Sequence, residues 1–156
     1  MSETRPPSRS PWVYLGLFFI TLSTLMFEIL LTRIFSVTMW YHFAFMAVSV
    51  AMFGMTVGAV IVYLRPASFT EERASAKLAE HSLWFSLTLV GAFVVFSHIP
   101  FRGVKDLSGA LLLALSYVVI AVPFVFSGIT VAVALTKVKA PVHRLYAADL
   151  LGAALG

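Results

Sequence analysis

The sequence predicts an all-α fold, a polytopic membrane helix bundle with four complete transmembrane helices and the start of a fifth. Composition is the first reason, since hydrophobic residues make up 60% of the 156 residues and charged residues only 12%, whereas soluble domains carry about 25%. The second reason is that apolar residues form long runs, because roughly twenty are needed to cross a bilayer core. The third is that prolines and charges gather between those runs.

The chain opens with a polar tail and a first apolar run. Residues 1–11 contain three prolines and few apolar side chains, so we expect a disordered cytoplasmic tail. Residues 12–35 are too long for the apolar core of a cleaved signal peptide, and no small-residue cleavage pattern follows them, so they predict a transmembrane helix. Polar side chains recur on one face of this helix, at Thr21, Thr24, Glu28 and Thr32. We expect this polar stripe to face protein rather than lipid.

The second predicted helix, residues 40–64, begins with an aromatic belt and carries a stripe of small residues. Trp40 and Tyr41 are typical of the membrane interface. The small residues recur at helical spacing and are Ala47, Ala51, Gly54 and Gly58. A Gly-xxx-Gly pair lets two helix backbones approach closely, so we expect this stripe to pack against another helix. The polar stripe of the first helix would face either this small stripe or the fourth helix, over residues 108–136.

A long polar segment separates the second and third helices. We interpret residues 66–82 as an amphipathic surface helix on the cytoplasmic side, because charges of both signs are mixed along it. Ser68 and Glu71 have the spacing of a capping box, which would start this helix.

Two further apolar runs complete the four-helix region of residues 12–144. Residues 83–99 and 108–136 predict the third and fourth transmembrane helices. Pro123 lies near the middle of the fourth helix, where the missing amide hydrogen and the bulk of the ring predict a kink.

Residues 145–156 begin like a transmembrane helix but are only twelve in number. Since roughly twenty residues are needed to span a bilayer, we interpret them as the truncated start of a fifth helix and expect the chain to be the front end of a longer membrane protein. One face of this segment is small apart from a single carboxylate, and it consists of Asp149, Gly152, Ala153 and Gly156. Such a face is suited to packing against another helix.

Lysine and arginine counts predict the orientation. With the N-terminus inside, eight cations lie on the inner side and three on the outer side, which favours a cytoplasmic N-terminus. The inner cations are Arg5, Arg9, Arg65, Arg73, Lys77, Lys137, Lys139 and Arg144. We therefore interpret the net charge of +4 as a sign of membrane topology and not of nucleic-acid binding.

Glu28 is the first candidate binding residue, because a carboxylate within a transmembrane helix is costly and usually has a function or a partner. Together with Thr24 and Thr32 on the same face, it is a hypothetical site for a proton, a cation or an amine. The alternative is a structural ion pair, for which the candidate partners are Arg33, His42, His98 and Arg102.

Asp149 is the second candidate binding residue. Its alternative explanation is structural, since the helix dipole stabilises a carboxylate near a helix N-terminus and Arg144 lies nearby in the sequence. The predicted topology places Asp149 and Glu28 near opposite membrane faces, so we do not expect them to act as a pair.

The motifs of soluble enzymes are missing from the sequence. No P-loop, dinucleotide-binding glycine motif, zinc-protease motif or nucleophile elbow occurs. The four histidines lack the i, i+3 or i, i+4 partners of a helical metal site, and there is no cysteine. We therefore predict no catalytic residue, no metal site and no cofactor in this chain.

Four stretches of the sequence resemble those of a known family, and they are residues 27–36, 40–45, 123–128 and 145–156. They resemble the membrane region of bacterial spermidine synthase-like proteins, which are often described as fused transporter-like and spermidine synthase proteins. The last stretch is the most specific, with Tyr146, Asp149, Gly152 and Gly156.

The resemblance implies a membrane region followed by a cytosolic transferase-like domain. That domain would bind S-adenosylmethionine or its decarboxylated form, and a polyamine where aminopropyl transfer occurs. These residues contain no such domain, so the expected function is a non-catalytic membrane module. Its partners would be the lipid bilayer, the remaining helices and cytosolic domain of the parent protein, and a second copy in a homo-oligomer. The alternatives are a fragment of a small-molecule or cation transporter, or a structural membrane scaffold.

Overall fold

The computed structural model describes residues 11–38, 42–98 and 107–156. The expected tail over residues 1–10, the aromatic belt at Trp40 and Tyr41, and Arg102 lie outside the described residues. The elements are α1 (Trp12–Thr38), α2 (His42–Leu64), the 3-10 turn η1 (Glu71–Arg73), α3 (Ala74–His98), α4 (Leu107–Lys137) and α5 (Val142–Leu155).

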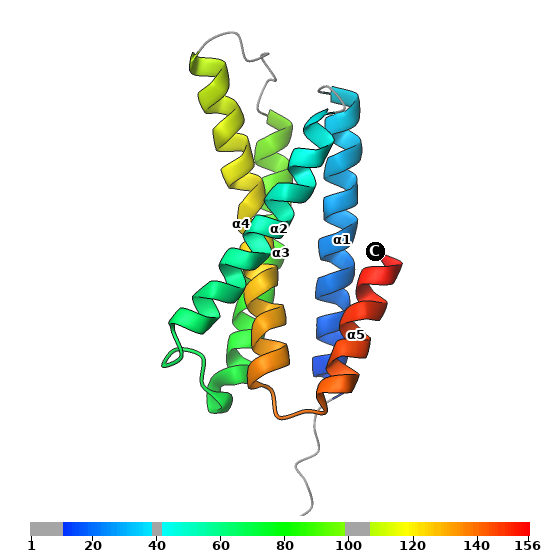
Figure 1. Ribbon diagram of the computed structural model, residues 1–156, viewed down its shortest axis with the longest axis vertical. Helices are drawn as coiled ribbons and strands as arrows, with labels where there is room; N and C mark the ends of the chain where they lie inside the picture. Colours follow the sequence, from blue (N-terminus) through cyan, green and yellow to red (C-terminus); the bar gives the residue numbers. More distant parts are fainter. Residues whose placement is uncertain (1–10, 39–41, 99–106) are drawn as a thin grey trace, which may run out of the picture.

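The described residues form an all-α bundle and contain no strand, which confirms the predicted fold class. Figure 1 shows α1, α3 and α5 running in one direction and α2 and α4 in the other. Within the described residues, four helices are long and apolar enough to cross a membrane, over Trp12–Val37, Ala44–Leu64, Glu71–His98 and Leu107–Lys137. The chain is thus a multi-pass membrane protein, and large apolar side chains such as Phe53 and Leu87 are exposed on the outside of the bundle, where lipid would cover them.

The helix α4 is the centre of the bundle, because it packs against both α2 and α3, while α1 packs mainly against α5 and α2. In Figure 1, α2 crosses α4 and α5 lies alongside α1. The largest core cluster joins α1 to α2 and α4, and its fully buried members include Leu31, Phe35, Ile120 and Phe124. Aromatic packing between Phe27 and Phe124, with ring centroids 5.5 Å apart, lies in the same cluster.

Glycine allows α2 and α4 to meet backbone to backbone. A Cβ atom on Gly58 would collide with the backbone of Val125 and Ile129, and one on Gly128 would collide with the backbone of Met55. Gly54 also lies close to α4, next to Phe124 and Ala121, and Ala47 and Ala51 are fully buried. The two glycines of the small stripe therefore pack on α4, while its two alanines lie in the core cluster that joins α1, α2 and α4.

The third helix differs from the prediction of two separate helices over residues 66–82 and 83–99. Residues 74–98 form one continuous helix, α3, because residues 74–82 contain no proline or glycine that would separate them from the apolar run that follows. Polar composition indicates exposure to water, but it does not prevent a helix from extending beyond the membrane.

The capping box predicted for Ser68 and Glu71 is not formed. Thr70 occupies the N-cap position, and it has no side-chain cap hydrogen bond. The backbone turns earlier, where the amide of Ser68 donates to the carbonyl of Arg65, and the side chain of Phe69 is buried beside α4 and α3. Burial of Phe69 thus takes the place of a polar cap at this corner.

The last two helices keep close to their predicted ranges. Pro123 is buried inside a continuous α4, and the kink there stays a prediction. The helix α5 begins at Val142 rather than Leu145, because the carbonyl of Pro141 accepts hydrogen bonds from the amides of Arg144 and Leu145. Its 14 residues rise about 21 Å, which is less than a bilayer core.

Candidate functional site

A buried hydroxyl pair connects α1 to α4. The Oγ1 atom of Thr24 lies 2.6 Å from the Oγ atom of Ser127 and 2.7 Å from the carbonyl of Ile20, one turn back in its own helix. Thr24 and Ser127 are 1% and 0% exposed. Since the single hydroxyl hydrogen of Thr24 is donated to Ile20, Ser127 is the donor in the pair. Ser127 was not among the predicted site residues, although a hydroxyl one turn after Pro123 is a usable signal.

A second contact connects α1 to α5. The Thr21 hydroxyl lies 3.1 Å from the carbonyl of Asp149 and 3.2 Å from the carbonyl of Leu17, so it bridges the two helices. The small face of α5 makes this approach possible, because a Cβ atom on Gly152 would collide with Thr21 and with the carbonyl of Phe18. Gly156 is equally close to the carbonyl of Leu22.

Glu28 lies one turn beyond Thr24 and is half-buried. Among the residues that the structure describes, none forms an ion pair with it. Of its predicted partners, Arg33 is exposed. Nδ1 of His98 lies 2.8 Å from the carbonyl of Val94, one turn back in its own helix. The side chain of His42 and all of Arg102 lie outside the described residues. Glu28 is thus a carboxylate within a membrane span without a described counter-charge.

The other two candidate binding residues do not join Glu28. Thr32 donates to the carbonyl of Ile29 in its own helix, at 2.7 Å. Asp149 is half-buried beside Thr21, and no described cation, Arg144 included, pairs with its carboxylate. Thr21 and Glu28 are seven positions apart on α1, or about 10 Å along the axis, so Asp149 and Glu28 do not share a site.

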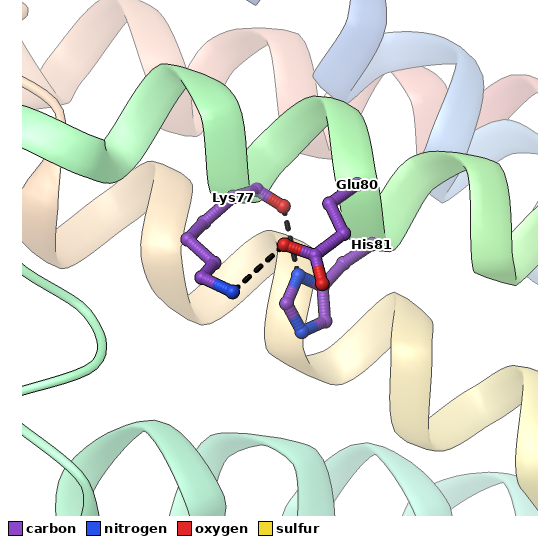
Figure 2. A network of polar contacts seen from close by, with 3 residues as sticks. All are labelled: Lys77, Glu80 and His81. Carbon is purple, nitrogen blue, oxygen red and sulfur yellow. Dashed lines mark hydrogen bonds and ion pairs between the residues drawn. The ribbon is translucent and has the colours of Figure 1, made fainter.

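Polar contacts of a different kind cluster at the end of the bundle where α3 begins. Figure 2 shows the ammonium of Lys77 pairing with Glu80 at 2.7 Å, while Nδ1 of His81 lies 2.8 Å from the carbonyl of Lys77. The His81 ring packs between Phe69 and Phe126, with centroid distances of 5.7 Å and 6.1 Å. These are local structural contacts within one end of the bundle.

A long-range ion pair closes the same end of the bundle. Lys139, in the loop between α4 and α5, lies 2.8 Å from Glu71 of η1. The hydrogen bond and the charge of Glu71 raise the pKa of the Lys139 ammonium. Both side chains are largely exposed, 74% and 57%, so the pair contributes little stability in water. Sequence inspection does not find this pair because 68 positions separate the two residues.

The described residues contain no group of three or more histidine, aspartate or glutamate side chains that could hold a metal ion. The fold and these contacts define a class, a multi-pass helical membrane bundle whose interior hydroxyls join neighbouring helices. Comparison of the chain with protein-family models, curated proteins and solved structures found no match.

Proposed function

We propose that this chain is a structural membrane module, which holds a protein in the bilayer and is not itself catalytic. The observation that supports it best concerns the interior polar groups. Thr21, Thr24 and Ser127 are hydrogen-bonded across helix interfaces, and no buried side-chain nitrogen or oxygen among the described residues lacks a partner. A catalytic or transport site needs polar groups left free for a ligand.

Close packing supports the same proposal. Two interfaces, α2 with α4 and α1 with α5, depend on glycines that no larger residue could replace without moving the helices. Rigid contact along Gly54 and Gly58 suits an anchor or scaffold better than a transporter whose helices must slide or rock.

The parent protein that we propose is a spermidine synthase-like protein of the bacterial inner membrane. The resemblance supports this proposal. Residues from the stretches that carry the resemblance pack the bundle together, since Phe27 packs on Phe124 and Gly152 packs on α1. In such a protein the transferase-like domain would bind S-adenosylmethionine or its decarboxylated form, and this chain would position that domain at the membrane.

A second candidate function is supported by Glu28 alone. A half-buried carboxylate in a membrane span, without a described counter-charge, could attract a polyamine or another cation. In this alternative the chain is a fragment of a small-molecule or cation transporter.

Uptake into proteoliposomes separates the two functions. The chain is reconstituted into vesicles, and entry of labelled spermidine and of monovalent cations is compared with entry into protein-free vesicles. The structural module predicts no uptake above the protein-free level for the natural chain or for Glu28→Gln. Uptake by the natural chain that Glu28→Gln abolishes, and that Thr56→Val on the exposed face of α2 leaves intact, would contradict the structural module and support transport.

A further inference from the structure

We draw no further inference here: the strongest candidate, the mostly apolar pocket that is lined by the start of α1, the start of α3 and the end of α4 around Gly16, Ser75 and Thr130, lies beside the exposed Trp12 near the first described residue, and nothing in the structure shows what covers it.

Discussion

At the scale of single residues, the hydroxyl pair of Thr24 and Ser127 shows how α1 is held to α4. A polar group in an apolar interior needs a partner, and each hydroxyl is the other's partner at 2.6 Å. Most other hydroxyls of the bundle, such as that of Thr56, donate to the carbonyl four positions back in their own helix. A hydrogen bond within one helix does not connect it to a neighbour, whereas the bond between Thr24 and Ser127 does.

A double-mutant cycle measures this contribution. We expect Thr24→Val and Ser127→Ala to be coupled by about 0.6 kcal/mol, with about 1.7 kcal/mol as the upper range, in the free energy of unfolding in mixed detergent micelles. The expected coupling energy is small because, when Thr24 is replaced, the Ser127 hydroxyl can donate to the carbonyl of Pro123 in its own helix. Thr56→Val is the control and should change little. Strictly additive effects of the two substitutions would contradict the pair.

At the scale of elements, the contact of α2 with α4 depends on the absence of side-chain atoms. Gly58 faces the backbone of Val125 and Ile129, and Gly128 faces Met55 in return. Two helices this close gain van der Waals contact along their length, which is a main source of helix association in lipid.

Substitution of Gly58 by leucine should separate α2 from α4. The added side chain has no space, so we expect a loss of about 2 kcal/mol or more in unfolding free energy, in the range of overpacked cores. Its neighbour Ala59 is exposed, and Ala59→Leu should cost almost nothing. Equal stability of the two leucine variants, measured in the same micelles, would show that the interface is not packed as described.

At the scale of the whole molecule, orientation in the membrane follows from where the cations lie. Lysines and arginines are more numerous at the end that holds η1, the start of α3 and the loop after α4. The pair of Lys139 with Glu71 joins two of these segments. The positive-inside rule then predicts that this end faces the cytoplasm.

Single-cysteine labelling checks the orientation, because the natural chain has no cysteine. Ser75 and Ser97 are exposed and lie at opposite ends of α3. An impermeant maleimide added outside intact spheroplasts should label Ser97→Cys and leave Ser75→Cys unlabelled until the membrane is opened. The reverse pattern would mean that the N-terminus is outside.

Much of the fold could be predicted because the relevant signals are local. The length of an apolar run and the energetic cost of bare backbone in lipid determine that α1, α2 and α4 are membrane helices, almost residue by residue. Helical spacing likewise predicts that Ala47, Ala51, Gly54 and Gly58 share a packing face. The extent of α3 was mispredicted because polarity marks the membrane boundary and not the end of a helix.

The sequence by itself determined the class of this protein, its four membrane-crossing helices and which faces of α1, α2 and α5 are polar or small. Only the tertiary structure decided the partners: the small stripe of α2 meets α4, while Thr21 bonds to α5 and Thr24 to Ser127. The physical reason is that periodicity identifies a buried face, but the helix that covers it depends on how all the helices cross at once.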